Sequence, residues 1–408
     1  MGAIVIVGAS LAGLRAAQAV RRGGHDGDLI VVGDEERGPY TRPPLSKELL
    51  AGEHEPEQCD FDHSGVDAQW RLGLRATALD AGARRLTLAS GDQLEYGRLI
   101  VATGAAARQW TGPGAGLAGV HTLRDVDDAL ALRAELGQGT RLVVVGAGFV
   151  GCEVAATARK RGAHVTLLDV AAHPIAPVGA AVGQRCAALH SGHGVDVRMD
   201  CGFAGFAGDE RLEAVELADG TSVPADVAVV ALGAVPNTAW LEGSGLVLER
   251  GGVVCDATLT AVGQPDVLCA GDVASWPHPL AGGDVVRVEH WTNAAEQGAA
   301  AGRNALLDPN QRAPYTAVPY FWTDQYDVKL QAVGFPARAQ QVHVLESEDD
   351  QFVAVGEADG HAVSAVAWNA PRRLMLYRRA LAAGPTVADL REQLAGSDKA
   401  LGRQVAAG

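Results

Sequence analysis

Two glycine-rich segments near the start of the chain have the residue types and spacing that bind a diphosphate. The first is G-A-S-L-A-G at residues 8–13, and the second is G-A-G-F-V-G at residues 146–151. The first glycine of such a turn permits a tight bend, the second lets backbone approach the pyrophosphate, and the third lets the helix pack on the sheet. The helix N-terminus then offers free N–H groups and a positive dipole end. Two turns indicate two bound dinucleotides, and two dinucleotides in one chain usually serve to pass a hydride between them.

The first turn departs from the pattern at its middle position. Gly8 and Gly13 keep the outer glycines, whereas Ser10 supplies a small side chain that can donate a hydrogen bond. Asp34 lies 21 residues after Gly13, the distance expected for a carboxylate that accepts from ribose hydroxyls, and Glu35 is the neighbouring candidate. The glycine turn, followed by an acid at this spacing, predicts a nucleotide-binding unit.

The second turn is complete. Gly146, Gly148 and Gly151 are all present, and Asp169 follows Gly151 by 18 residues. A carboxylate there accepts from a ribose 2′-hydroxyl and repels a 2′-phosphate, and residues 170–174 contain no arginine to bind such a phosphate. We therefore expect this unit to bind NADH rather than NADPH.

Glu153 lies two residues after the last glycine of the second turn. One interpretation is an acid that complements the positive end of the helix dipole. The interpretation we favour is a contact with the nicotinamide carboxamide.

Each turn must be positioned by a buried strand before it and a helix after it. The apolar runs before the turns predict the strands, and the Ala-rich stretches after them, each ending at glycine, predict the helices. The expected strands cover residues 3–7, 29–32, 142–145 and 164–168, and the expected helices cover residues 11–22 and 149–161.

Length, charge and cysteine content exclude several classes of protein. A chain of 408 residues suits two or three domains, and its formal charge of −15 argues against nucleic acid as the partner. No apolar run is long enough for a membrane span, and a strand at about residue 3 leaves no room for a signal peptide, so we expect a cytoplasmic protein. The six cysteines contain no C-x-x-C or C-x4-C pair. This spacing argues against a zinc site, an iron–sulfur cluster and a dithiol redox centre, so no metal is predicted.

Several segments are more specific than the glycine turns. The run P-Y-T-R-P-P-L-S-K at residues 39–47 and the run F-W-T-D-Q at residues 321–325 resemble the FAD-dependent NADH–ferredoxin reductases that serve bacterial cytochrome P450s and Rieske oxygenases. The resemblance covers nearly the whole chain. It extends to A-T-G at residues 102–104, G-A-V-P-N at 233–237, C-A-G-D-V-A at 269–274 and V-E-H-W at 288–291.

The resemblance implies roles for individual residues. Lys47 would lie beside the isoalloxazine ring near N5, paired with Glu153, and these two would be the catalytic residues. Asp272 would accept from a ribityl hydroxyl, Trp291 would cover the flavin ring, and Arg124 would reach the pyrophosphate. The residues expected at FAD are Gly8, Ser10, Ala12, Gly13, Asp34, Glu35, Arg42, Lys47, Ala78, Thr103, Gly104, Arg124, Gly271, Asp272, Glu289, His290 and Trp291. Those expected at NAD are Gly146, Gly148, Phe149, Val150, Gly151, Glu153, Asp169 and Gly233.

The expected fold is α/β, with two Rossmann-like dinucleotide-binding domains in the arrangement of glutathione reductase and a C-terminal α+β interface domain. The FAD domain would be discontinuous, at residues 1–108 and 243–315, with the NAD domain at 109–242 inserted into it. Residues 316–408 alternate apolar and polar side chains, which predicts an antiparallel sheet followed by helices at about 372–383 and 387–394.

The expected activity is transfer of a hydride from NADH to FAD, followed by release of single electrons to a [2Fe-2S] ferredoxin of a P450 or Rieske system. The protein would be a monomer or weak homodimer. No cysteine precedes Cys59, which argues against a disulfide substrate. An NADH oxidase or rubredoxin-type reductase remains an alternative, as does a redox-sensing protein like apoptosis-inducing factor.

Docking of an acidic ferredoxin on an acidic protein would need a local positive face. Four arginines on one predicted helix and one elsewhere are candidates, and a solvated helix face is the alternative. These arginines are Arg372, Arg373, Arg378, Arg379 and Arg303. Trp322 is a candidate for the space between the flavin edge and the partner.

Overall fold

A computed structural model describes residues 2–348 and 351–394 of the chain. Its contacts group these residues into two compact units. Unit 1 comprises residues 2–44, 54–107 and 234–317, and unit 2 comprises residues 45–53, 108–233 and 318–394. The three domain boundaries expected from the sequence stay a prediction. None of the described helices is long and apolar enough to cross a bilayer.

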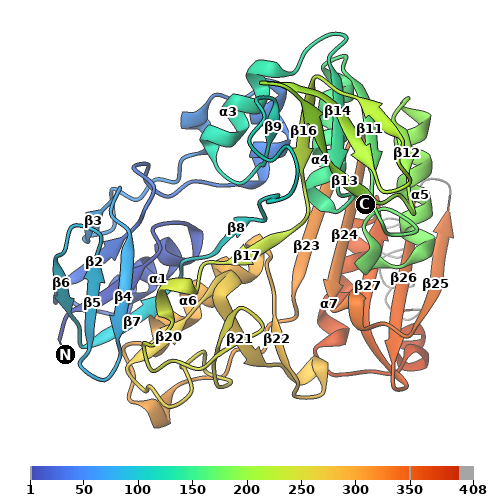
Figure 1. The fold of residues 1–408 in the computed structure, drawn as a ribbon. Coiled ribbons are helices and arrows are strands. Elements are labelled where there is room, and N and C mark those ends of the chain that lie inside the picture. The colour runs from blue at the N-terminus through green and yellow to red at the C-terminus, as the bar shows by residue number, and fades with distance from the viewer. Residues whose placement is uncertain (1, 349–350, 395–408) are drawn as a thin grey trace. The chain divides into compact units, whose positions relative to one another are not determined.

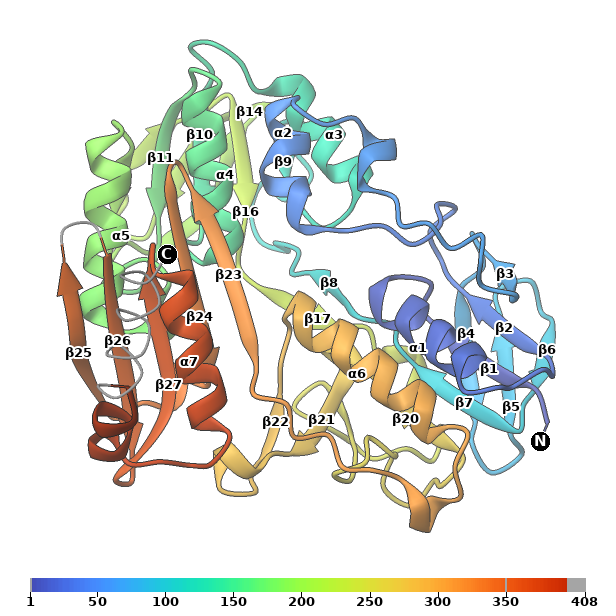
Figure 2. The same ribbon diagram turned by 180° about the vertical axis from the view of Figure 1, so that it is seen from behind.

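Unit 1 is built on a five-stranded parallel sheet in the order β20-β7-β1-β2-β3 (Figures 1 and 2). All residues of β1 and β2 are buried, which explains why these strands read as continuous apolar runs. The strands are β1 (Ile4–Val7), β2 (Leu29–Val32), β3 (Gln69–Arg71), β7 (Arg98–Val101) and β20 (Val267–Cys269).

Two helices of unit 1, α1 (Leu11–Arg22) and α6 (Trp291–Asn304), lie side by side (Figure 2). Two glycines of α6 allow this close approach. A Cβ on Gly298 would lie 2.2 Å from the carbonyl oxygen of Ala12, and a Cβ on Gly302 would lie 2.5 Å from that of Ala16. These two glycines therefore let the backbones of α1 and α6 pack closely.

Smaller sheets complete unit 1. They comprise a three-stranded antiparallel sheet, a four-stranded mixed sheet and the antiparallel pair β8–β17. Their strands are β4 (Ala76–Asp80), β5 (Arg85–Leu88) and β6 (Gln93–Glu95); β18 (Leu248–Glu249), β19 (Gly252–Val254), β21 (Ala274–Pro277) and β22 (Val285–Arg287); β8 (Ala105–Ala107) and β17 (Ala234–Pro236). The 3-10 helix η5 (Gly271–Val273) follows β20.

Unit 2 contains a second five-stranded parallel sheet, in the order β12-β11-β10-β16-β9. Its strands are β9 (Val120–His121), β10 (Arg141–Val145), β11 (His164–Leu168), β12 (Asp196–Arg198) and β16 (Val227–Val230). The helices are α3 (Val126–Glu135), α4 (Phe149–Lys160) and α5 (Ala180–Gly192), and the short α2 (Glu48–Ala51) belongs to the same unit. An antiparallel sheet of β13 (Phe203–Gly208), β14 (Leu212–Leu217) and β15 (Ser222–Pro224) packs its apolar face into the core of this unit.

The C-terminal part of unit 2 is the expected antiparallel sheet, in the order β23-β24-β27-β26-β25 (Figure 1). Helix α7 (Pro371–Leu381) packs against β24 and β27, and residues 387–394 are helical. The strands are β23 (Tyr320–Gln325), β24 (Val328–Gly334), β25 (Gln341–Glu348), β26 (Gln351–Ala358) and β27 (His361–Trp368). Burial alternates along β23 and places Phe321, Thr323 and Gln325 on the buried face. Two parallel sheets and a C-terminal α+β region confirm the expected fold class.

Candidate active site

The second glycine turn has the geometry that a pyrophosphate needs. A Cβ on Gly146 would lie 2.4 Å from the carbonyl oxygen of Ala231, and a Cβ on Gly151 would lie 1.9 Å from that of Gly146. A Cβ on Gly148, in contrast, would meet no atom within 4 Å. Packing therefore requires the two outer glycines, whereas the middle one leaves open space at the N-terminus of α4, where a diphosphate fits.

Asp169 lies at this turn, directly after β11. Its Oδ2 accepts from the backbone N–H of Ala147 at 2.7 Å, and its Oδ1 accepts from that of Ala171 at 2.9 Å. The carboxylate thus holds the glycine turn in place, a role that the sequence did not indicate. Its predicted contact with a ribose stays a prediction.

The first turn has the same outer geometry. Gly8 has a φ of 116°, and its Cβ would lie 2.1 Å from the carbonyl oxygen of Ala102. A Cβ on Gly13 would lie 1.8 Å from the carbonyl oxygen of Gly8. Ser10 is the N-cap residue of α1, and its side chain makes no capping hydrogen bond to the helix. The serine hydroxyl at the middle position is therefore not used to cap α1.

The acids after β2 differ in their surroundings. Asp34 is exposed, with its carboxylate 3.9 Å from Arg75 Nε. Glu35 Oε2 accepts from the hydroxyl of Tyr40 at 2.6 Å, and Glu35 Oε1 accepts from Arg42 Nη2 at 2.5 Å. The guanidinium of Arg42 also lies over the Tyr40 ring. The structure therefore brings together two of the predicted FAD residues, Glu35 and Arg42, as an ion pair.

Three elements of unit 1 meet beside the first turn: α1, η5 and α6. A Cβ on Gly271 would lie 3.4 Å from Ala12 Cβ and 3.5 Å from Ala294 Cβ. The backbone N–H of Gly271 donates to Gln297 Oε1 at 2.8 Å, and Asp272 is buried next to it. The predicted FAD residues Ala12, Gly271 and Asp272 are thus neighbours.

The N-terminus of α6 carries the V-E-H-W segment. His290 is the N-cap residue, and Trp291 is the first residue of the helix. Burial lowers the pKa of His290 to about 4, so the imidazole is neutral at neutral pH. Glu289 is exposed and forms an ion pair with Arg287.

Thr103 and Gly104 contact the G-A-V-P-N segment. Thr103 Oγ1 donates to the carbonyl oxygen of Asn237 at 2.8 Å, and Asn237 Nδ2 donates to that of Thr103 at 2.9 Å. The backbone N–H of Asn237 donates to the carbonyl oxygen of Gly104. The A-T-G and G-A-V-P-N segments, which were predicted separately, are therefore hydrogen-bonded to one another in unit 1.

A buried ion pair in unit 2 joins the two predicted catalytic residues. Lys47 Nζ lies 2.9 Å from Glu153 Oε2, and the exposed fractions of the two side chains are 14% and 8%. Ser46 Oγ also donates to Glu153 Oε2, and Thr323 Oγ1 donates to Glu153 Oε1 at 2.7 Å. Both carboxylate oxygens therefore have partners, which offsets the cost of burying the charge. The predicted pairing of Lys47 with Glu153 is confirmed, although Glu153 lies in the second turn of α4 rather than the first.

Ser46 and Thr323 are the residues that the sequence analysis missed. Each lies inside a specific run, R-P-P-L-S-K or F-W-T-D-Q, but neither was given a role. The available indication was the alternation of β23, which places Thr323 on the same face as Phe321 and Gln325. Phe321 contacts Phe149 of α4 with ring centroids 4.9 Å apart, so this face packs on the helix of the second turn.

The remaining predicted residues lie on several elements. Ala78 is exposed on β4, in the three-stranded sheet of unit 1. Arg124 belongs to unit 2, where its backbone N–H donates to Asp128 Oδ2. Val150 is exposed on the first turn of α4, and a Cβ on Gly233 would meet no atom within 4 Å.

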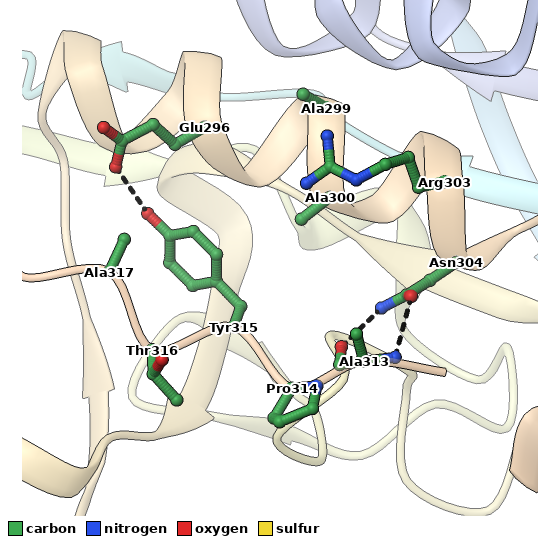
Figure 3. Close-up of a pocket in the computed structure, with 10 residues that line it drawn as sticks. All are labelled: Glu296, Ala299, Ala300, Arg303, Asn304, Ala313, Pro314, Tyr315, Thr316 and Ala317. Carbon is green, nitrogen blue, oxygen red and sulfur yellow. Dashed lines mark hydrogen bonds between the residues drawn. The ribbon is translucent and has the colours of Figure 1, made fainter. Parts of the chain in front are cut away.

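A separate pocket of about 460 Å³ lies along α6 in unit 1 (Figure 3). The helix residues from Glu296 to Asn304 form one wall, and residues 313–317 form the other. The hydroxyl of Tyr315 donates to Glu296 Oε2 at 3.2 Å, and the side chain of Asn304 bonds the backbone of Ala313. Arg303, a predicted docking residue, extends its guanidinium along the helix wall of this pocket.

The four arginines of α7 are not equivalent. Arg372 and Arg379 are exposed, with the half-exposed Met375 between them on the same face. Arg378 instead donates from Nε to the carbonyl oxygen of Val318 at 3.0 Å and lies near the ring of Tyr320. Arg378 is therefore partly held by packing, and its place on the predicted positive face stays a prediction.

Comparison with known proteins gives the family. Residues 2–298 match the family described as pyridine nucleotide-disulphide oxidoreductase, and residues 320–403 match the family described as reductase C-terminal. The biphenyl dioxygenase system ferredoxin–NAD(+) reductase component of Paraburkholderia xenovorans is 38% identical over 397 residues, covering 96% of this chain and 95% of that protein. Rhodocoxin reductase of Rhodococcus erythropolis is 36% identical, covering 86% of this chain and 82% of that protein.

A solved structure agrees with these relatives. The crystal structure of the covalent putidaredoxin reductase–putidaredoxin complex contains a chain that matches with a TM-score of 0.88 and 31% identity, covering 94% of this chain and 93% of that one. The open space at Gly148 and the meeting of Ala12, Gly271 and α6 beside the first turn fit two dinucleotides. The chain therefore belongs to the pyridine nucleotide-disulphide oxidoreductases, among the ferredoxin reductases, and is an NADH-dependent flavoprotein oxidoreductase.

Proposed function

We propose that the protein takes hydride from NADH onto FAD and passes single electrons to a [2Fe-2S] ferredoxin that serves a cytochrome P450 or Rieske oxygenase. The observation that carries this proposal is the buried Lys47–Glu153 pair, whose carboxylate lies on α4, the helix of the second glycine turn. The relatives' names supply the class of acceptor. Bound flavin would supply the chemistry that joins a two-electron donor to a one-electron acceptor.

The residues of unit 2 would bind and orient the nicotinamide cofactor. Gly148 leaves room for the pyrophosphate, and the N-terminus of α4 supplies N–H groups and a positive dipole end. The carboxylate of Asp169 already holds the turn and would also accept from the ribose 2′-hydroxyl. A 2′-phosphate would meet this negative charge, which favours NADH over NADPH.

Lys47 and Glu153 would set the electrostatics around the reacting part of a bound cofactor. The ammonium group of Lys47 favours negative charge near it, and the carboxylate of Glu153 fixes its position at 2.9 Å. Ser46 and Thr323 hold the carboxylate itself, so the pair cannot rotate freely. These bonds position a charge and exclude water. Proximity and orientation of the bound cofactors would lower the barrier to hydride transfer.

The residues of unit 1 would hold FAD. Ser10 and the N-terminus of α1 would bind the pyrophosphate, Glu35 the adenosine ribose and Asp272 a ribityl hydroxyl. The N-terminus of α6 offers a positive dipole end, and the neutral His290 and Trp291 lie there. Arg42 would act through its ion pair with Glu35.

The ferredoxin would dock on exposed cations. Arg303 at the pocket of unit 1 is one candidate, and the face of α7 with Arg372 and Arg379 is another. Trp322, which stacks near Tyr320, is a candidate for the electron path. A monomer or weak homodimer is the expected state, and a cytoplasmic place would match the NADH pool.

The test is NADH-driven reduction of cytochrome c by the purified protein, with and without a [2Fe-2S] ferredoxin encoded near its gene. We expect fast flavin reduction by NADH and a several-fold increase in cytochrome c reduction when the ferredoxin is added. Fast flavin reduction without any ferredoxin effect would contradict the proposed acceptor. Rapid oxygen consumption would then favour an oxidase, and an NADH-dependent change of oligomeric state would favour a redox sensor.

The two docking candidates are separated by charge reversal. Arg303→Glu and the double variant Arg372→Glu/Arg379→Glu are compared with Arg250→Glu, a control at an exposed arginine that has no assigned role. The variant at the true docking face should raise the KM for ferredoxin and leave flavin reduction by NADH unchanged. An unchanged KM removes that face from the proposal.

A further inference from the structure

Two cysteines and a histidine meet in the core of unit 2, outside the predicted cofactor contacts. Cys152 lies on α4, one residue after the second glycine turn, whereas Cys186 and His190 lie on α5 four residues apart. One donor atom from each of the three lies within 4.8 Å of the others. All three side chains are at most 1% exposed. An i, i+4 pair on one helix with a third donor on a second helix is an arrangement that chelates metal ions.

A fourth donor comes from the buried face of β23. Gln325 Oε1 lies 3.1 Å from Cys186 Sγ and 3.0 Å from His190 Nε2. Donor atoms of a tetrahedral zinc site lie about 3.3–3.8 Å apart, given metal–ligand bonds of about 2.0–2.3 Å. The two separations at Gln325 are close to that range, so a small outward movement of its amide admits an ion.

The ring of His190 has a partner on its other side. Its Nδ1 lies 3.2 Å from the hydroxyl oxygen of Tyr326, and Tyr326 stacks on His193 with ring centroids 3.7 Å apart. A histidine that binds metal through Nε2 characteristically donates its Nδ1–H to such a partner, which fixes the tautomer and the ring orientation. Tyr326 therefore provides the outer support that a metal ligand needs.

We propose that Cys152, Cys186 and His190, with Gln325 Oε1 as the fourth donor, bind one zinc ion. Binding releases the two Sγ–H protons, leaves the Nε2 lone pair on the metal and keeps the remaining ring proton on Nδ1, facing Tyr326. The two thiolates balance the charge of Zn²⁺, so the loaded site is neutral and tolerates complete burial. The site has no open position for a reacting water, so its role is structural.

The zinc would brace the strand that holds the active-site carboxylate. Gln325 Nε2 lies 3.4 Å from Thr323 Oγ1, and Thr323 donates to Glu153. An ion bound at Gln325 would thus link α4, α5 and β23. Thr323 would connect this site to Glu153. This inference does not depend on which acceptor the enzyme uses.

The test is metal analysis of the full-length flavoprotein produced in zinc-supplemented medium, because the buried donors must receive the ion during folding. We expect about one zinc per chain in the wild-type protein after gel filtration with a chelator. Cys186→Ser and His190→Gln should each lose most of it. The matched control is Cys255→Ser, since Cys255 and Cys269 form a buried thiol pair in unit 1 without a histidine.

A second measurement keeps the test decisive if the variants fold poorly. Wild-type protein produced with cobalt in place of zinc should show the d–d bands of tetrahedral cobalt, to the red of the flavin spectrum. Less than about a tenth of an equivalent of zinc in the wild-type protein, together with no cobalt bands, would overturn the proposal. The four groups would then form a hydrogen-bonded core cluster.

Discussion

The two glycine turns of this chain share their outer positions and differ at the middle one. In both, the first and last glycines touch neighbouring carbonyl oxygens so closely that no Cβ fits. In the second turn the middle residue is Gly148, beside open space, whereas in the first it is Ser10, whose hydroxyl does not cap its own helix. Packing therefore requires the outer glycines, and we expect the ligand to set the middle position.

The ion-paired carboxylates Glu35 and Glu153 differ in how deeply they are buried. Glu35 of unit 1 pairs with Arg42 and is 37% exposed, whereas Glu153 of unit 2 pairs with Lys47 and is 8% exposed. Glu35 also accepts a hydrogen bond from a tyrosine hydroxyl, and Glu153 accepts hydrogen bonds from Ser46 and Thr323. A buried pair depends on every partner, while a partly exposed pair can replace a lost partner with water.

The largest effect is expected from alanine at an outer glycine. Gly151→Ala places a Cβ 1.9 Å from the carbonyl oxygen of Gly146, which should cost about 3 kcal/mol or more of folding free energy. Gly148→Ala enters open space, so stability should stay within about 0.5 kcal/mol while the KM for NADH rises at least about tenfold. Thermal unfolding and steady-state kinetics measure the two. Equal loss of stability in Gly151→Ala and Gly148→Ala would contradict the distinction between glycines required by packing and a glycine required by the ligand.

The next effect concerns the two ion pairs. Glu153→Gln leaves the buried ammonium of Lys47 without its counter-charge and should destabilise the protein by about 3 kcal/mol. Glu35→Gln, at the partly exposed pair, should cost about 1 kcal/mol or less. Thr323→Val removes one partner of Glu153 and should fall between them, at about 1–3 kcal/mol. Urea unfolding gives all three values, and the reverse order would contradict the role assigned to burial.

A smaller effect is expected at Asp169. Asp169→Asn keeps an acceptor oxygen for the backbone N–H of Ala147 but removes the charge that would repel a 2′-phosphate. The preference for NADH over NADPH, measured as the ratio of kcat/KM values, should fall by about tenfold, or about 1.4 kcal/mol. The wild-type ratio must first favour NADH; comparable values for the two cofactors would contradict the proposed role.

The buried His290 gives unit 1 a pH-dependent stability. Its pKa of about 4 in the folded protein lies below the value of 6.5 expected when unfolded, so the unfolded state binds more protons between these values. Its contribution to stability is therefore complete above pH 6.5 and is lost as the pH falls toward 4. Urea unfolding as a function of pH should show this slope in the wild-type protein, and His290→Gln should reduce it.

The smallest effect is expected for Ser10→Gly, which restores the full glycine pattern in the first turn. The fold should be unaffected, because the Ser10 side chain does not cap α1. Flavin affinity should change by less than about tenfold, since a lost hydroxyl donor is offset by closer backbone approach. Flavin release followed by fluorescence measures this, and complete loss of flavin would show that the hydroxyl is essential.

Local patterns in the sequence predicted the elements around the turns well. Helix α1 and strands β2 and β11 have the predicted bounds, because apolar periodicity and terminal glycines are local properties. Helix α5, in contrast, was not predicted at all. Helix α5 has little amphipathic pattern to reveal it, since alanines and glycines dominate its first half.

The site depended on contacts that no local pattern contains. Thr323 lies 170 residues from Glu153, and Ser46 lies 107 residues from it. The spacing of Cys186 and His190 becomes meaningful only once α5 is known to be helical, and Cys152 joins them from another helix. For this reason a cysteine-spacing rule that looks for nearby pairs excluded zinc at the sequence level.

The grouping of residues 45–53 with unit 2 has a consequence for how the protein comes apart. The chain passes between the units five times, after residues 44, 53, 107, 233 and 317. Each unit is therefore assembled from three separate pieces of polypeptide, and neither corresponds to a contiguous fragment that a gene truncation could deliver. A single proteolytic cut at one passage leaves the halves joined by the other four, and a graft that exchanges nicotinamide specificity must splice at several junctions at once.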